Sequence, residues 1–119
     1  MAKALYIDDD LYMHRLVKLL FKDQNIQFDF VAEGRSALKY LMDNQYDIIF
    51  TDIQMPGISG IELIQKIREK QSSIPIVIVS AFKGKLSISE LEYRNDIRII
   101  DKPFTRKQIM SVAQELLKY

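Results

Sequence analysis

Short apolar runs alternate with longer segments of helical period along almost the whole chain. The apolar runs cover residues 4–7, 26–32, 47–50, 74–79 and 97–100. Between them, apolar residues recur at spacings of three and four, the period of a helix with one buried face. Strands that alternate with helices form a parallel sheet covered on both faces, and right-handed connections make it doubly wound. The order therefore predicts an α/β fold of (βα)5 type with a five-stranded parallel sheet.

Three local signals refine this prediction. Residues 74–79 are almost purely β-branched, which is typical of a central strand buried on both faces. Thr105 and Gln108 form a capping box that predicts the start of the last helix. Ser87 and Glu90 form a second box, so we expect a short fourth helix to begin near Ile88.

Length, charge and composition exclude several classes of protein. A chain of 119 residues suits one domain, so we expect residues 1–119 to form a single unit. With 17 basic and 16 acidic residues, the net charge of +1 argues against a strongly basic nucleic-acid-binding surface. There is no cysteine, which excludes disulfides and Cys-ligated zinc. The apolar runs are too short to span a bilayer, and we expect a cytoplasmic protein that contacts neither nucleic acid nor membrane.

Polar side chains follow four of the five predicted strands at the point where each strand ends. They comprise three adjacent acids, a further acid, a hydroxyl and an ammonium group: Asp8, Asp9, Asp10, Asp52, Ser80 and Lys102. Ligands of such sheets bind beyond the carboxyl ends of the strands, so we expect these groups to share one crevice. Clustered carboxylates recruit a cation, and hard oxygen ligands suit Mg²⁺. The sequence thus predicts a magnesium site.

Purely structural roles could explain some of these residues. An acid after a strand often caps the next helix, which suits Asp10 but not Asp52, because Asp52 is followed by Ile-Gln-Met-Pro. Ser80 alone is uninformative, and no histidine is placed to activate it as a nucleophile. His14, the one histidine of the chain, is interpreted as a surface or boundary residue of the first helix.

Four segments together resemble the receiver domain of two-component response regulators. They are Ala-Leu-Tyr-Ile-Asp-Asp-Asp at residues 4–10, Asp-Ile-Ile-Phe-Thr-Asp-Ile-Gln-Met-Pro-Gly at 47–57, Pro-Ile-Val-Ile-Val-Ser-Ala at 75–81 and Asp-Lys-Pro-Phe at 101–104. Each motif is weak alone, but the set in this order is highly specific and spans the chain. The resemblance implies a flavodoxin-like three-layer sandwich with strand order 2-1-3-4-5.

The resemblance also implies a ligand set for Mg²⁺. Asp9 and Asp52 would bind the metal directly, and Asp8 would hold its water molecules. Gln54 would offer its backbone carbonyl to the metal.

The same resemblance implies the chemistry and the partners. Asp52 would accept a phosphoryl group from a phosphohistidine on a sensor histidine kinase or a phosphotransfer protein. Lys102 and Ser80 would bind the phosphoryl oxygens. The domain would assist its own phosphorylation and dephosphorylation without being an enzyme, and the surface of helix 4, strand 5 and helix 5 would then bind a downstream effector. The family usually has an aromatic residue three positions before the lysine, where this chain has Ile99.

Two other hypotheses compete. A Mg²⁺-dependent phosphatase with an aspartate nucleophile usually has a second acid two residues later, where this chain has Gln54. Turnover of a small phosphoester would favour it. A receiver-like binding module that acts without phosphorylation would bind its partner equally well after Asp52→Ala.

Overall fold

The computed structural model describes residues 1–54, 57–58, 60–70, 73–81 and 96–117. This part contains five strands: β1 (Ala2–Ile7), β2 (Ile26–Val31), β3 (Ile48–Asp52), β4 (Ile76–Ser80) and β5 (Ile97–Asp101). It also contains four helices: α1 (Leu11–Leu20), α2 (Gly34–Asp43), α3 (Gly60–Lys70) and α5 (Arg106–Leu117). The helix predicted near Ile88 lies outside the described residues.

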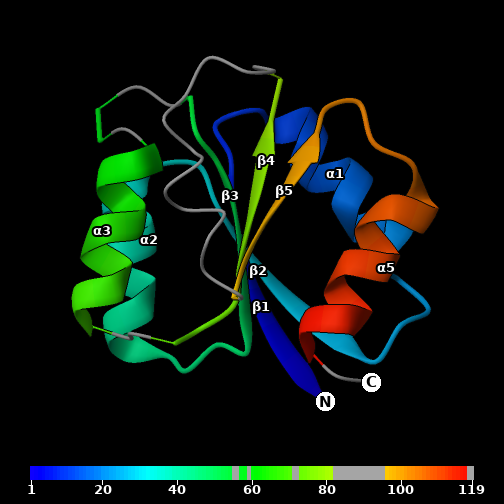
Figure 1. Cartoon of the computed structure of the whole chain (residues 1–119), viewed down its shortest axis with the longest axis horizontal. Coiled ribbons are helices and arrows are strands. Elements are labelled where there is room, and N and C mark those ends of the chain that lie inside the picture. Colours follow the sequence, from blue (N-terminus) through cyan, green and yellow to red (C-terminus); the bar gives the residue numbers. More distant parts are fainter. Residues whose placement is uncertain (55–56, 59, 71–72, 82–95, 118–119) are drawn as a thin grey trace.

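The strands form one parallel sheet in the order β2-β1-β3-β4-β5, which confirms the expected topology. In Figure 1, α2 and α3 cover one face of the sheet, and α1 and α5 cover the other. All predicted strand boundaries hold within two residues. The fourth strand begins at Ile76, two residues later than predicted, because Pro75 has no N–H to give to the ladder. None of the described helices is both long enough and apolar enough to cross a membrane.

Alternation along each strand divides the core into two layers. In β1, Leu5 and Ile7 pack toward α2 and α3, whereas Ala4 and Tyr6 pack toward α1 and α5. The α2/α3 layer is largely aliphatic. The α1/α5 layer includes several aromatic rings in contact with one another.

The strand register brings the polar strand ends to one edge of the sheet. Asp52 pairs with Val79, and Ser80 pairs with Asp101. The Lys102 N–H donates to the Ser80 carbonyl at 2.8 Å, which continues the ladder one residue beyond β5. The carboxyl ends of β1, β3, β4 and β5 therefore meet at one edge of the sheet, as predicted.

The two predicted caps that fall on described residues are confirmed, whereas the Ser87–Glu90 box lies outside the described residues. The Asp10 side chain accepts from the Tyr12 N–H at 2.9 Å and caps α1. At α5, the Gln108 N–H donates to Thr105 Oγ1 at 3.1 Å, and the Thr105 N–H donates to Gln108 Oε1 at 2.8 Å. These caps satisfy backbone donors that the first turn of a helix leaves unpaired.

Candidate functional site: an acidic cluster bridged by a lysine

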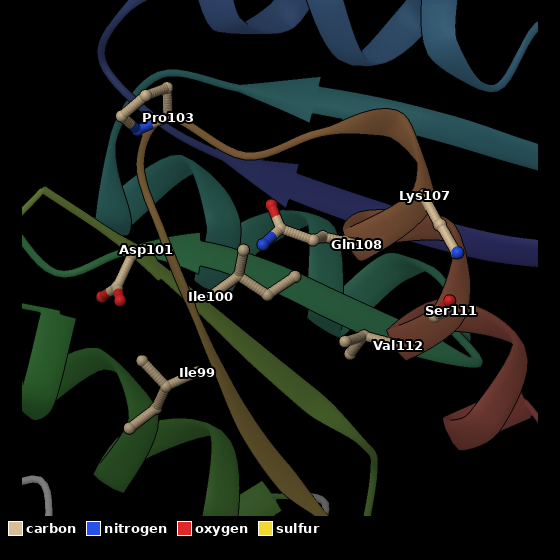
Figure 2. A pocket seen from close by; sticks show the side chains of 8 residues that line it. All are labelled: Ile99, Ile100, Asp101, Pro103, Lys107, Gln108, Ser111 and Val112. Atoms are coloured by element: carbon tan, nitrogen blue, oxygen red, sulfur yellow. The ribbon is translucent and has the colours of Figure 1, made fainter.

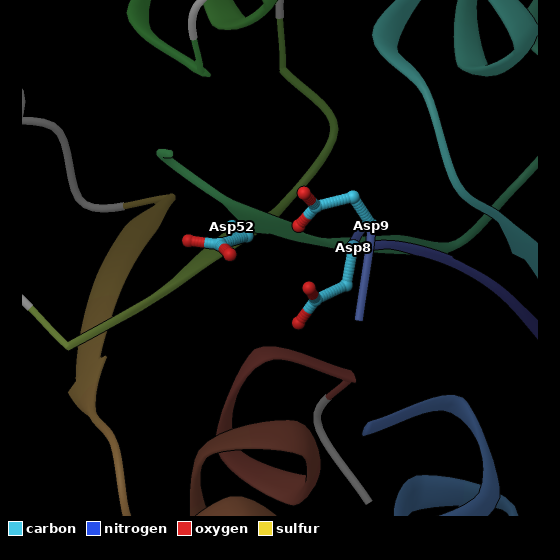
Figure 3. Close-up of side chains that lie close together, drawn as sticks. All are labelled: Asp8, Asp9 and Asp52. Carbon is cyan, nitrogen blue, oxygen red and sulfur yellow. The ribbon is translucent and has the colours of Figure 1, made fainter. Parts of the chain in front are cut away.

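Three carboxyl groups gather beyond the ends of β1 and β3 (Figure 3). Asp8, Asp9 and Asp52 each offer an oxygen atom, and these oxygens lie within 4.8 Å of one another. Asp8 and Asp52 are buried, whereas Asp9 is exposed. Three carboxylates this close repel one another unless a cation neutralises them. The predicted meeting of these acids is thus confirmed.

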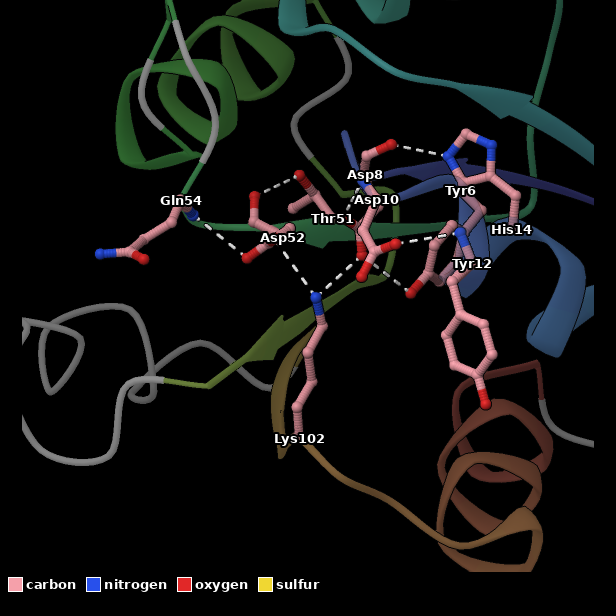
Figure 4. Close-up of polar contacts among 9 residues, drawn as sticks. All are labelled: Tyr6, Asp8, Asp10, Tyr12, His14, Thr51, Asp52, Gln54 and Lys102. Carbon is pink, nitrogen blue, oxygen red and sulfur yellow. Dashed lines mark hydrogen bonds and ion pairs between the residues drawn. The ribbon is translucent and has the colours of Figure 1, made fainter.

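Asp8 is fully buried, with 0% of its surface exposed, and it has several polar partners. Its Oδ1 accepts from the Asp10 N–H at 3.0 Å. Its Oδ2 accepts from Lys102 Nζ at 2.9 Å and from the Tyr6 hydroxyl at 3.3 Å (Figure 4). These donors compensate for the loss of water around a buried carboxylate.

Asp52 ends β3 and is 8% exposed. Its Oδ1 accepts from the Gln54 N–H at 3.1 Å, and its Oδ2 accepts from Lys102 Nζ at 3.3 Å. Burial raises the pKa of the Asp52 carboxyl above its usual range. The Gln54 N–H and the Lys102 charge lower it in part, and the Asp8 charge raises it further.

Lys102 bridges the two buried acids (Figure 4). Burial alone would lower the pKa of its ammonium, but Asp8 and Asp52 outweigh that effect and raise it. Lys102 thus stays positively charged at neutral pH. Among the residues that the structure describes, its ammonium is the positive charge nearest to the cluster. Lys102 beyond β5 meets acids beyond β1 and β3 because parallel strands end at the same edge of the sheet, and its long side chain extends past the end of β4.

The other two predicted site residues lie at the same edge. Ser80 ends β4 and is buried. Gln54 is exposed two residues after β3, where its backbone N–H holds Asp52. The role predicted for its carbonyl stays a prediction.

Sequence reasoning missed two residues that contact Asp8. Tyr6 looked like an ordinary strand residue, yet its hydroxyl reaches the Asp8 carboxylate. His14 is half-buried, as expected of a boundary residue, and its Nε2 lies 2.6 Å from the Asp8 carbonyl oxygen. One signal was present for Tyr6: residues two apart on a strand share a face, so Tyr6 and Asp8 lie on the same side of the sheet.

The model of the response regulator receiver domain family matches residues 4–114. The chain belongs to this family. It is therefore a receiver domain of two-component response regulators, a signalling domain. Receiver domains bind Mg²⁺ at an acidic pocket, and the carboxyl groups of Asp8, Asp9 and Asp52 supply oxygen ligands of the kind Mg²⁺ prefers.

Several relatives resemble this receiver domain. The response regulator ArlR of Staphylococcus saprophyticus is 29% identical over 119 residues, which cover 99% of this chain and 53% of ArlR. The transcriptional regulatory protein ResD of Bacillus subtilis is 31% identical, over 98% of this chain and 48% of ResD. The chain thus spans about half the length of these curated relatives.

Solved structures agree with the fold. The Thermotoga maritima response regulator TrrA, in complex with Mg²⁺-BeF, superposes with a TM-score of 0.86 at 27% identity, covering 98% of this chain and 99% of TrrA. The receiver domain of the Francisella response regulator 1452 gives a TM-score of 0.87 at 28% identity, covering 99% and 98%.

Proposed function

We propose that residues 1–119 act as one receiver domain in the cytoplasm, in which Asp52 accepts a phosphoryl group in a Mg²⁺-dependent reaction. The observation that carries this proposal is the pair of contacts from Lys102 to Asp8 and Asp52. A half-buried ammonium beside a buried carboxylate provides a nucleophile and a neutralising charge in one place. Phosphoryl transfer depends mainly on such positioning and charge neutralisation.

The residues of the acidic cluster fit a magnesium ion. Asp9 and Asp52 would bind it directly, and the Gln54 carbonyl would add a third oxygen ligand. Asp8 accepts three hydrogen bonds from the chain, one more than Asp52, and would hold metal-bound water. The ion would supply positive charge to the phosphoryl oxygens during transfer.

The transfer itself needs little from the protein beyond geometry. An oxygen of the Asp52 carboxylate would form the new P–O bond while the P–N bond of a phosphohistidine breaks, and the electron pair of that bond stays on the imidazole nitrogen. The Gln54 N–H and Lys102 hold the two Asp52 oxygens before the reaction. Lys102 and Ser80 would then bind phosphoryl oxygens, and the same groups would assist later hydrolysis.

An apolar groove beside the site suits the partner that carries the phosphohistidine. The groove has a volume of about 430 Å³, and Lys102 lines it together with apolar residues of α1 and of the segment after β5, including Met13, Leu16 and Phe104. Tyr12, at its rim, is 67% exposed. Because Lys102 belongs to both the groove and the acidic site, a sensor kinase or phosphotransfer protein seated here could present its histidine to Asp52.

The output surface would use β5 and α5. A cavity of about 580 Å³ lies between them, and its lining includes Ile99, Asp101 and Gln108 (Figure 2). Asp101 immediately precedes Lys102, so a shift of Lys102 toward a phosphoryl group would move this surface. Such new charge-assisted contacts can bias a two-state element. A downstream effector would read the change; the predicted contribution of helix 4 lies outside the described residues.

Intact mass spectrometry after incubation with acetyl phosphate tests the proposal. The wild type should gain about 80 Da, one phosphoryl group, only when Mg²⁺ is present. The variant Asp52→Ala should gain nothing, while Asp10→Ala, which removes a helix cap, should still be labelled. A folded wild type that binds Mg²⁺ without gaining mass would favour the phosphorylation-independent module. Steady turnover of a small phosphoester would instead favour the phosphatase.

A further inference from the structure

His14 of α1 contacts the main chain of the acid-bearing loop. Its Nε2 lies 2.6 Å from the Asp8 carbonyl oxygen. A carbonyl oxygen only accepts hydrogen bonds, so the imidazole carries its proton on Nε2 and donates it here. This contact fixes the backbone of Asp8 from the side of the helix.

Aromatic rings hold the imidazole in this orientation. The Tyr6 ring meets it edge-on, with ring centroids 6.0 Å apart and planes at 85°, and Phe30 lies at 5.3 Å. Tyr6 also donates its hydroxyl to the Asp8 carboxylate (Figure 4). His14 and Tyr6 therefore hold Asp8 at two points: His14 at the backbone carbonyl and Tyr6 at the carboxylate.

The same loop carries Asp9, which lies between two anchored residues. The Asp8 N–H donates to the Val31 carbonyl at 3.1 Å, and Asp10 begins α1 as its cap. The carboxylates repel one another. Without a divalent metal ion, a movement of Asp9 away from Asp52 would therefore lower the electrostatic energy of the loop. The His14 contact opposes that movement because it ties the loop to a packed helix.

We propose that His14 is a positioning residue for the cation site: its Nε2–H keeps the loop of Asp8 and Asp9 in the place that a divalent cation requires. Partners that orient ligands in this way commonly change metal affinity when they are removed. This inference rests on the proposed function, since it assumes that Mg²⁺ binds at the acidic cluster.

Two variants separate hydrogen bonding from packing. His14→Phe keeps an aromatic ring against Tyr6 and Phe30 but cannot donate. His14→Gln loses the ring but keeps an N–H donor close to the position of Nε2. Isothermal titration of each purified chain with Mg²⁺ alone gives the dissociation constants, and urea unfolding shows that each variant is folded.

We expect the Phe variant to bind Mg²⁺ about tenfold more weakly than the wild type. The Gln variant should bind within about twofold of the wild type, even where it is the less stable of the two. A Phe variant that binds as tightly as the wild type, or a Gln variant at least as impaired as the Phe variant, would overturn the proposal. If the Phe variant fails to fold, His14→Met, which also lacks a donor, takes its place.

The wild type supplies the check on the proposed function. A wild-type chain that binds no Mg²⁺ contradicts the magnesium site itself and this inference with it. A wild type that binds Mg²⁺ beside a Phe variant of equal affinity contradicts only the role of His14.

Discussion

The two faces of the sheet carry different kinds of polar contact. On the α2/α3 face, Arg68 donates to the Ile74 carbonyl at 2.7 Å and pairs with Asp96 at 2.9 Å, so it ties the amino ends of β4 and β5. On the α1/α5 face, Tyr6 and His14 reach Asp8 at the carboxyl end of β1. The contacts of the α2/α3 layer thus stabilise the amino ends of the strands, whereas those of the α1/α5 layer support the acidic site at the carboxyl ends. Substitutions on the two faces should therefore separate stability from metal affinity.

The largest expected effect on stability lies in the α2/α3 layer. Leu63 is fully buried there, and Leu63→Ala should lower the free energy of unfolding by about 2–5 kcal/mol, because it leaves a cavity in a packed core. Urea unfolding measures the loss. The Mg²⁺ affinity of the folded fraction should stay within about twofold of the wild type. A large fall in that affinity would break the distinction between the two faces.

Lys102→Met should have the next largest effect. It leaves Asp8 and Asp52 buried without their cation, so we expect a loss of about 1–3 kcal/mol at pH 7. The pKa of Asp52 should rise further, because Lys102 now lowers it. The loss should therefore shrink as the pH falls and Asp52 binds a proton, and it should also shrink when Mg²⁺ is added. Urea unfolding at several pH values measures this, and a loss independent of both pH and Mg²⁺ would contradict the charge argument.

Thr105→Ala tests whether any change on the α1/α5 face disturbs the site. Thr105 caps α5, and its loss should lower stability by about 1 kcal/mol. Thermal unfolding measures this change, and calorimetric titration should give the wild-type Mg²⁺ affinity. A weakened affinity would mean that the whole layer, and not the Tyr6–His14 contact with Asp8, supports the acids.

Asp52→Asn should give the smallest change, with the opposite sign. The pKa of Asp52 is raised in the fold, so folding disfavours its charged form, and this penalty grows as the pH rises from the acid range through the raised pKa. Removing the charge should slightly stabilise the chain at pH 7 and leave stability unchanged at low pH. Urea unfolding at both pH values checks the sign. A variant that is less stable than the wild type at pH 7 would show that the Lys102 pair outweighs burial.

Much of the fold follows from local pattern, and the strand order follows from resemblance. The β-branched run at 74–79 identifies a buried strand because only a strand covered on both faces is apolar throughout. The proximity of Asp8, Asp52 and Lys102 could be predicted from the sequence, because parallel strands end at one edge of the sheet. Nothing in the alternation of elements specifies that β1 lies between β2 and β3; that order came from the family.

The support beneath the site could not be predicted. In the sequence, Tyr6 fits its strand and His14 fits its helix as ordinary packing residues. Their contacts with Asp8 depend on how α1 packs on β1. The 2.6 Å hydrogen bond from His14 to Asp8 depends on the position of the imidazole, which the packing of Phe30 and the other rings of the layer sets. Such a contact arises from packing between elements, which periodicity does not encode.

The proposed phosphoacceptor is Asp52, and not a neighbouring acid. The most direct test treats the chain with acetyl phosphate and Mg²⁺, reduces the acyl phosphate with borohydride, and locates the resulting homoserine by peptide mass spectrometry. We expect conversion at residue 52 alone, and no conversion when Mg²⁺ is left out. Conversion at Asp8, Asp9 or Asp10, or no conversion in a folded chain that binds Mg²⁺, would contradict it.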